Sequence, residues 1–300
     1  MRKICINILM CFLGFAGLAQ INSGSPSIPF GSKTSYGNGI MPTNLPTSGT
    51  YVASSDAATA YNEWKSNFVE SCTIGSRVKF TGTNSAYTVS EGIGYGMLLA
   101  AYAGDKTLFD NLWKYYNANK SSNHGLMNWE VNGCSNTAVG TGGATDGDLD
   151  AAMALIIASN QWPSATSPYT YQTEALTFLS NIRKYEFDQS TYQTLNGDAW
   201  NNSCRNPSYF APAYYKEFAT FDVSNATFWN NATTAANTLL TGNANSTTGL
   251  VSNWCSNTSP YADNNCGNTK TGYAEDACRN PWRMAVDYLW HGSSATTAAT

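Results

Sequence analysis

The chain has 300 residues, of which 42% are hydrophobic and only 12% are charged, and its net charge is −4. This composition excludes a disordered chain and is typical of a globular protein with a substantial core. The lack of a basic block argues against nucleic acid and anionic membranes as partners. Aromatic residues make up 13% of the chain, so a neutral, ring-rich surface favours a neutral polar polymer such as carbohydrate.

The first segment, residues 1–19, has the pattern of a secretory signal peptide. A short basic stretch precedes an apolar run that is too short to span a membrane, and small residues near Ala19 offer a cleavage site. Residues 20–50 are rich in Ser, Gly and Pro, which predicts an extended lead-in. We therefore expect a secreted protein, extracellular or periplasmic, with no membrane association after signal cleavage.

From residue 51 onward the hydrophobic periodicity predicts helices, without the alternation of strands and helices that a doubly wound sheet needs. One helix is expected to begin with Ser90 as its cap, and the others are predicted at 58–72, 107–119, 147–162, 173–187, 226–242 and 276–292. The helix at 147–162 is almost entirely apolar after an acidic start, so we expect it to be deeply buried. Long polar loops separate the helices, and such loops are uncommon unless they are functional.

Cysteine and histidine usage bears on disulfides and metals. Two of the eight cysteines lie in the signal segment, and secretion permits the other six to form disulfides. The pair that we favour is Cys255–Cys266, which closes a short polar loop. No CxxC pair occurs, and the two histidines, His124 and His291, are far apart in sequence. A metal site is therefore not expected, and neither is a cofactor.

Acidic residues gather at three predicted helix starts. They are Glu91, the group Asp146, Asp148 and Asp150, and the pair Glu275 and Asp276. One interpretation is capping, because acids at a helix start satisfy free N–H groups and the helix dipole. The other is catalysis, because paired carboxylates beside aromatic-rich loops are typical of glycoside hydrolysis.

Three glycines follow the first of these carboxylates, at positions 92, 94 and 96, and each costs a helix interior about 1 kcal/mol relative to alanine. Side chains there would block a polymer that passes over the helix start or would crowd a neighbouring helix. A helix N-terminus favours an ionised carboxylate, whereas a general acid must hold its proton. Since a nearby negative charge opposes ionisation, we expect Asp146 to lie close to Glu91.

Several aromatic residues lie in loops marked by glycine or proline, among them Trp129, Trp200 and Tyr209. Sugar rings have apolar faces that stack on aromatic planes, so these side chains are candidates for substrate binding. For each of them the alternative is packing in the core.

Five segments together resemble glycoside hydrolase family 8, a family of secreted bacterial endo-1,4-β-glucanases with chitosanase, lichenase and xylanase relatives. The segments are SEGIGYGMLLA, GLMNW, ATDGDLDAAMALIIA, NPSYFAPAYY and DACRNPWRMAVDY. The resemblance implies an all-α fold, an (α/α)6 barrel, with the catalytic domain at 51–300. The family runs on beyond the last predicted helix, so we expect a C-terminally truncated domain that lacks its closing helix.

The resemblance also implies site residues. It makes Glu91 the general acid, Asp276 the general base, and Asp146 the residue that positions sugar and water in the central subsite. It carries substrate binding onto Trp129, Trp200, Tyr209 and Arg279. The residue before the base is often Tyr in the family, and Glu275 stands there in this chain, which leaves open a second carboxylate at the base.

The expected activity is therefore that of an inverting endo-β-glycosidase, a cellulase that acts on cellulose or mixed-linkage β-glucan without a metal or cofactor. The alternatives are a chitosanase or xylanase of the same family, or a non-catalytic carbohydrate-binding protein on the same scaffold. The expected partner is a polysaccharide, and the expected oligomeric state is a monomer.

Overall fold

The computed structural model describes residues 54–200, 203–259, 261 and 272–292. The described chain forms two compact units, an N-terminal unit that ends at Asn181 and a C-terminal unit that begins at Ile182. The predicted signal peptide and lead-in lie outside the described residues. Among the helices that the structure describes, none is both long and apolar enough to cross a membrane.

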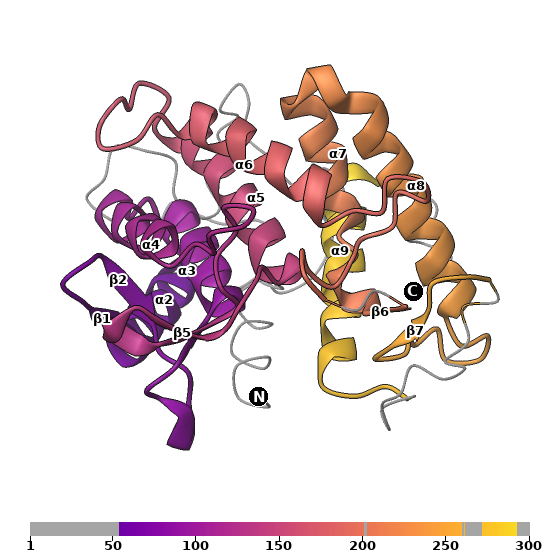
Figure 1. Ribbon diagram of the computed structural model, residues 1–300, viewed down its shortest axis with the longest axis horizontal. Coiled ribbons are helices and arrows are strands. Elements are labelled where there is room, and N and C mark those ends of the chain that lie inside the picture. The colour runs from indigo at the N-terminus through magenta and orange to yellow at the C-terminus, as the bar shows by residue number, and fades with distance from the viewer. Residues whose placement is uncertain (1–53, 201–202, 260, 262–271, 293–300) are drawn as a thin grey trace. The chain divides into compact units, whose positions relative to one another are not determined.

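The N-terminal unit is built on helices (Figure 1). They are α2 (Ser54–Phe68), α3 (Ser90–Ala103), α4 (Lys106–Ala118), α5 (Thr145–Gln161) and the first part of α6 (Tyr171–Tyr185). Helix α3 packs against α2, α4 and α5. Every residue of α5 from Thr145 to Ala158 is buried, which confirms the prediction of a deeply buried helix.

The glycines after Glu91 are explained by how α3 meets its neighbours. A Cβ atom on Gly94 would lie 2.6 Å from the carbonyl oxygen of Gly147, and one on Gly147 would lie 2.6 Å from the amide nitrogen of Glu91. Real Cβ atoms do not approach other atoms so closely, so the two helices touch main chain to main chain. A Cβ on Gly92 would meet nothing closer than 3.7 Å. The sequence suggested two reasons for these glycines, room for a passing polymer and room for a neighbouring helix. The second reason accounts for Gly94.

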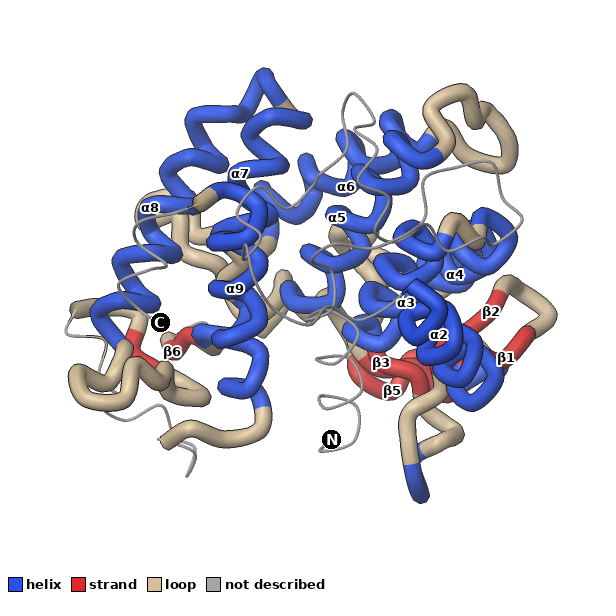
Figure 2. Tube along the Cα trace, turned by 180° about the vertical axis from the view of Figure 1, so that it is seen from behind, coloured by secondary structure: helices blue, strands red, loops and turns tan. Residues whose placement is uncertain are grey.

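Short strands join the helices of this unit (Figure 2). Strands β1 (Val69–Ser71) and β2 (Ser76–Val78) form an antiparallel pair, and β3 (Thr88–Val89), β4 (Glu130–Asn132) and β5 (Thr137–Gly140) form an antiparallel sheet in that order. The 3-10 turns η1 (Gly82–Asn84) and η2 (Gly133–Ser135) accompany them. A disulfide between Cys72 and Cys134 ties β1 to the loop between β4 and β5.

The C-terminal unit contains α7 (Pro212–Phe221), α8 (Ala226–Asn243) and α9 (Arg279–His291), and α7 packs against both of the others (Figure 1). Strands β6 (Cys204–Arg205) and β7 (Cys255–Ser256) pair antiparallel. Three 3-10 turns, η3 (Pro207–Tyr209), η4 (Val223–Asn225) and η5 (Asp276–Cys278), precede the helices. The core is aromatic, with the buried Trp229 in edge-on contact with Phe187, Phe218 and Phe228.

Some local predictions are wrong. Ser90 is the first residue of α3 rather than its cap, and its amide donates to the carbonyl oxygen of Trp129 at 3.0 Å. Helix α7 was not expected, because its proline and its neighbouring loop obscure the periodicity, yet Pro212 stands in its first turn, where a missing N–H costs nothing. The disulfide favoured for Cys255 is also wrong, because the buried Cys255 forms no disulfide, whereas Cys204 does. Cys266 lies outside the described residues.

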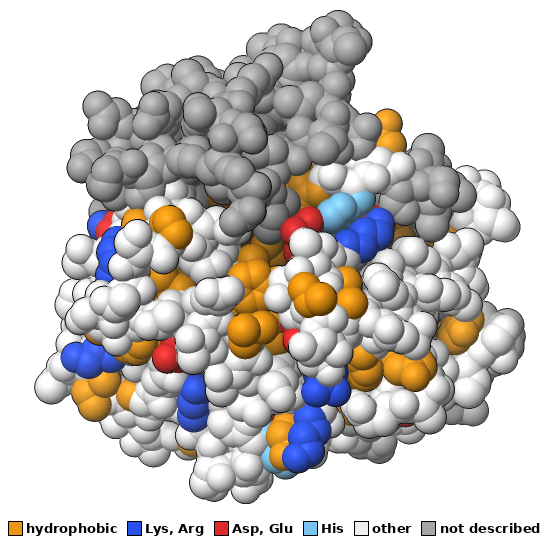
Figure 3. Space-filling model, turned by 90° about the horizontal axis from the view of Figure 1, so that it is seen from above, with side chains coloured by type: hydrophobic (Ala, Val, Ile, Leu, Met, Phe, Trp, Pro, Cys, Tyr) orange, Lys and Arg blue, Asp and Glu red, His pale blue; other side chains and the backbone are white. Residues whose placement is uncertain are grey.

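The described surface has the neutral character expected from the composition. On the face shown in Figure 3, charged side chains are few and scattered among neutral polar ones.

Candidate active site

Glu91 is the second residue of α3, in the first turn of that helix, and its side chain is half-buried. The hydroxyl of Tyr95, one turn later, donates to its Oε1 atom at 3.0 Å. The spacing of four residues places both side chains on one face of the helix. The hydrogen bond from Tyr95 restricts the orientation of the Glu91 carboxyl group. Because the side chain is only half-buried, part of it stays accessible.

Asp146 lies in the first turn of α5 and is 3% exposed. The residue after it, Gly147, is the point at which α5 touches the Ser90–Glu91 peptide of α3. The main chain therefore brings the start of α5 against the start of α3, in agreement with the expected proximity of Asp146 and Glu91. The distance between the two carboxyl groups stays a prediction.

The capping interpretation receives no support at the cap positions. The N-cap residues of α3, α5 and η5 are Val89, Ala144 and Glu275, and none of them makes a side-chain capping hydrogen bond. The acidic residues Glu91, Asp146 and Asp276 stand one or two positions further on, inside the first turn.

Trp129 lies just before β4 in the same unit. Its main chain joins the sheet to the start of α3, because its carbonyl oxygen accepts the Ser90 amide and its amide donates to Gly142 at 2.9 Å. Its indole ring lies on Gly140, where an added Cβ would be 2.1 Å from Cε2 of the ring. The missing side chain at Gly140 is therefore what gives the Trp129 ring its place.

In the C-terminal unit, Asp276 opens η5, and its side chain is 32% exposed. Its two oxygens are bound by different donors. The amide Nδ2 of Asn206 donates to Oδ2 at 3.0 Å, and the guanidinium of Arg279 contacts Oδ1 at 3.0 Å. The following amide, that of Ala277, donates to Oδ1 of the buried Asn253 at 2.8 Å, which fixes the turn that carries Asp276. Glu275, directly before it, is exposed.

Arg279 also connects the carboxylate to an aromatic residue, because its guanidinium lies 5.4 Å from the centre of the Tyr209 ring. Tyr209 is 8% exposed and ends η3. Its carbonyl oxygen accepts from the hydroxyl of Tyr215 at 3.3 Å. Burial raises the pKa of Tyr215 to about 12, so that this hydroxyl stays protonated. Trp200, the least firmly matched aromatic, lies half-buried in the loop before β6.

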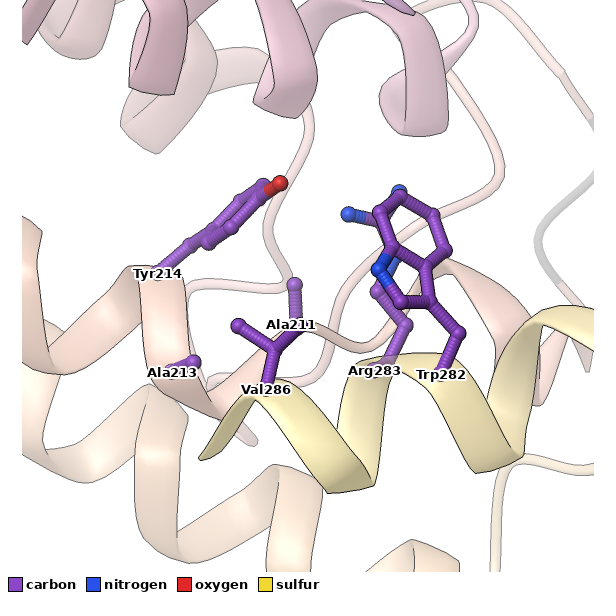
Figure 4. Close-up of a pocket in the computed structure, with 6 residues that line it drawn as sticks. All are labelled: Ala211, Ala213, Tyr214, Trp282, Arg283 and Val286. Carbon is purple, nitrogen blue, oxygen red and sulfur yellow. The ribbon is translucent and has the colours of Figure 1, made fainter. Parts of the chain in front are cut away.

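A small pocket lies in the C-terminal unit, at the side of α9 that faces the start of α7 (Figure 4). Its lining consists of Ala211, Ala213, Tyr214, Trp282, Arg283 and Val286. The guanidinium of Arg283 stands 4.3 Å from the centre of the Trp282 ring and 5.1 Å from that of Tyr214. The rings and the guanidinium pack against one another and fill this space, so the pocket leaves no room for a ligand.

The structure thus brings the predicted residues together in two groups. Glu91, Asp146 and Trp129 surround the starts of α3 and α5, and Asp276, Arg279 and Tyr209 surround η3 and η5. Sequence reasoning missed Tyr95 and Asn206. The i,i+4 spacing from Glu91 was available for Tyr95, whereas nothing in the spacing of Asn206 announces a contact with a residue 70 positions away. In the part of the chain that the structure describes, no cluster of three metal-ligating side chains occurs.

Comparison with known proteins assigns a family. The model of glycosyl hydrolases family 8 matches residues 40–300. Endoglucanase A of Acetivibrio thermocellus is 35% identical over 301 residues, which cover 97% of this chain and 60% of that protein. Endoglucanase C of Ruminiclostridium cellulolyticum is 34% identical over 282 residues, which cover 92% of this chain and 59% of that protein. The chain therefore spans about three fifths of the length of these curated relatives.

A solved structure supports the fold. The apo structure of a β-1,3-1,4-glucanase from Paenibacillus sp. X4 matches with a TM-score of 0.72 and 30% identity, over 80% of this chain and 67% of that one. The predicted all-α class is confirmed, and so is the assignment to a family of (α/α)6 barrels. The chain belongs to glycosyl hydrolases family 8.

Proposed function

We propose that the chain is a secreted, endo-acting hydrolase of β-1,4-glucan that works by single displacement with inversion. The family membership supports hydrolysis of a glycosidic bond. Two relatives more than 30% identical are named endoglucanases, and the matching solved structure is a β-1,3-1,4-glucanase. On the face shown in Figure 3, charged side chains are few, which suits an uncharged polysaccharide.

The observation that carries the proposal is the setting of Asp276. Its carboxylate accepts from Asn206 on one oxygen and from Arg279 on the other, and it keeps contact with solvent. Donors on both oxygens hold the carboxylate in one orientation, as a general base that must face its water requires. Glu275 lies next to it in sequence but is exposed. Asp276 is accordingly the better candidate of the two for the base.

In the proposed reaction, Glu91 gives its proton to the glycosidic oxygen as the bond to the leaving sugar breaks. Asp276 takes a proton from a water molecule that attacks the anomeric carbon from the opposite face. Asp146 orients the sugar and the water in the central subsite, and Trp129 and Tyr209 stack on sugar rings. An inverting enzyme needs room for that water beside its general base.

The roles of Glu91 and Asp276 can be distinguished by comparing substrates whose leaving groups differ in their need for protonation. We expect Glu91→Gln to lose nearly all activity on β-glucan and to recover on an aryl cellobioside whose phenol leaves without protonation. Asp276→Asn should be inactive on both substrates, because water activation is needed in each case. Glu275→Gln is the matched control and should keep the parent's kcat within about threefold.

Two results would reject these roles. A Glu91→Gln variant that hydrolyses β-glucan at the parent's rate is not compatible with a general acid at Glu91. If Glu275→Gln lost activity while Asp276→Asn kept it, the general base would be Glu275. Proton NMR of the first product tests the stereochemistry, since inversion of a β-linkage gives the α-anomer first.

The substrate is tested by release of reducing sugar from carboxymethylcellulose, lichenan, xylan and chitosan measured side by side. We expect the two glucans to be hydrolysed fastest. Chitosan is the second candidate because the exposed Glu275 places an additional negative charge next to Asp276, which suits a cationic polymer. A preference for chitosan that disappears in Glu275→Gln would establish that alternative.

Secretion is proposed from the signal-like segment and is supported by the Cys72–Cys134 disulfide, since stable disulfides are typical of oxidising compartments. The mature chain is expected to begin near Gln20 and to be monomeric. N-terminal sequencing of the protein recovered from the culture medium or periplasm tests the cleavage site, and size-exclusion chromatography with light scattering tests the monomer.

A further inference from the structure

The further inference concerns how Asp276 is held, and it rests on the proposed function of that residue as general base. Asn206 and Ser208 are fully buried, and Arg279 is 7% exposed. With Asp276 they form a closed ring of hydrogen bonds, in which Asp276 is the member that reaches solvent to the greatest extent.

The ring has four links. Asn206 Nδ2 donates to Asp276 Oδ2 at 3.0 Å, and Ser208 Oγ lies 2.8 Å from Asn206 Oδ1. Arg279 Nε donates to Ser208 Oγ at 3.1 Å, and its terminal nitrogen closes the ring at 3.0 Å from Asp276 Oδ1.

Only one arrangement of hydrogens satisfies these contacts. The Nε–H of Arg279 can only donate, so the hydroxyl of Ser208 accepts from it and gives its own hydrogen to Asn206 Oδ1. The Ser208 amide also donates to Oδ1, at 3.1 Å, which fixes the orientation of the Asn206 amide. Its NH2 group must therefore face Asp276. Both neighbours of the carboxylate are then donors, and the ring accommodates Asp276 as an acceptor.

The ring is anchored to the fold behind it. The main-chain amide of Asn206 donates to Oδ1 of Asn196 at 3.1 Å, and Nδ2 of Asn196 donates to the carbonyl oxygen of Cys204 at 3.0 Å. This places Asn206 at the end of β6, which pairs with β7. The orientation of the Asp276 carboxylate is thereby fixed through Asn206 by the β6–β7 sheet, although its own side chain could rotate.

We propose that Asn206 and Ser208 are positioning residues for the general base, and that they hold the Asp276 carboxylate in line for the attacking water. A misplacement of a catalytic group by 1 Å lowers rates about 100-fold. Loss of either positioning residue should therefore lower the rate of the chemical step.

The test compares two asparagines with similar hydrogen-bond patterns. Asn243 accepts at Oδ1 from the amide of a serine, Ser252, at 2.8 Å, and donates from Nδ2 to a carbonyl oxygen, that of Tyr261, at 2.8 Å. The Ser252 hydroxyl lies 2.8 Å from the same Oδ1 and 2.7 Å from the carbonyl oxygen of Trp254. Asn243→Ala therefore removes a comparable set of contacts within the same unit. Melting temperature and the folded fraction are measured for all variants, and rates are expressed per folded molecule.

We expect Asn206→Ala to lower kcat about 10–100-fold with KM within about threefold, equally on β-glucan and on the aryl cellobioside. Ser208→Ala should lower kcat by about tenfold or less. Asn206→Asp keeps the shape of the side chain but places a carboxylate against Asp276, so it should be no more active than Asn206→Ala. Asn243→Ala should keep the parent's kcat.

Two outcomes overturn the inference. One is a kcat for folded Asn206→Ala within twofold of the parent. The other is an Asn206→Asp variant with the parent's kcat, which would show that Asn206 serves packing alone. Asp276→Asn is measured in parallel, and if it stays active the base assignment itself fails. A failure of the proposed function is thus distinguished from a failure of the ring.

Discussion

In the N-terminal unit, Glu91 is placed by contact between main chains, whereas in the C-terminal unit Asp276 is placed by polar side chains. Helices α3 and α5 approach closely because Gly94 and Gly147 have no side chains. Asp276 is directed by Asn206 and Arg279 at 3.0 Å each. The placement of Glu91, the proposed acid, should therefore be disturbed by side chains added at the helix contact. The placement of Asp276, the proposed base, should be disturbed by the loss of a hydrogen-bonding side chain.

The largest effect on this comparison is expected from Gly94→Ala, with Gly92→Ala as its control in the same helix. The Cβ of Gly94→Ala would lie 2.6 Å from a main-chain oxygen and 3.0 Å from Cβ of Asp150. Overpacking of this kind lowers the free energy of unfolding by about 1–3 kcal/mol, and the shift of α3 also displaces Glu91. We expect an accompanying loss of kcat of about tenfold or more.

Gly92→Ala should have the opposite sign. Its Cβ meets ordinary contacts at 3.7 Å, and alanine is favoured over glycine in a helix by up to about 1 kcal/mol. Chemical denaturation followed by circular dichroism measures both variants. Equal stability of Gly94→Ala and Gly92→Ala would show that main-chain contact does not set the position of α3.

A second prediction uses a titrating group of the C-terminal unit, Glu217 on α7. Burial raises the pKa of Glu217 from 4.5 to about 7. Its carboxyl group lies 3.2 Å from Nε2 of His291, whose own pKa is lowered by burial, and the neighbouring Lys216 is paired with Asp287 at 2.6 Å. Because the folded state holds the Glu217 proton more tightly than the unfolded state, this group costs stability as the pH rises from about 4.5 to about 7.

Glu217→Gln should remove that cost. We expect the stability of the variant relative to the parent to increase by about 1–2 kcal/mol between pH 5 and pH 8, most of it below pH 7. His291 acts in the opposite direction, since a lowered pKa makes its neutral form favoured in the fold and costs stability as the pH falls. Because the two side chains are in contact, comparison of the two proteins at each pH reports the loss of Glu217 together with its effect on the titration of His291. A difference in stability between the two proteins that stays constant from pH 5 to pH 8 would contradict the assignment.

The same contrast explains what the sequence could predict. Periodicity located α5 and α8, because a long apolar stripe determines a helix and its burial from local spacing alone. Glu91 and Asp146 were recognised from motifs at helix starts. The Asn206–Asp276 contact joins residues 70 positions apart, and the Gly140–Trp129 contact depends on a hairpin register that periodicity does not determine. The Cys255 prediction failed because short loop closure says nothing about where the side chain points.

The smallest effect is expected at that Gly140–Trp129 contact. An alanine Cβ at position 140 would lie 2.1 Å from Cε2 and 2.2 Å from Nε1 of the indole, so the ring must move. If the ring stacks on a sugar, Gly140→Ala should raise KM for β-glucan about 3–10-fold, equivalent to about 1 kcal/mol, with kcat within about threefold. Gly272→Ala, where an added Cβ meets nothing within 4 Å, is the control and should match the parent.

A double-mutant cycle decides whether Gly140 acts through Trp129. Once the indole is removed by Trp129→Ala, the Cβ at position 140 has nothing to displace, so the double variant should bind substrate no more weakly than Trp129→Ala alone. Additive losses in KM would mean that Gly140 acts on the β4–β5 hairpin and not on the ring. The cycle therefore extends the contrast between the units. In the N-terminal unit, the methyl group added by Gly140→Ala should lower the affinity for substrate by moving the Trp129 ring, although it removes no polar contact.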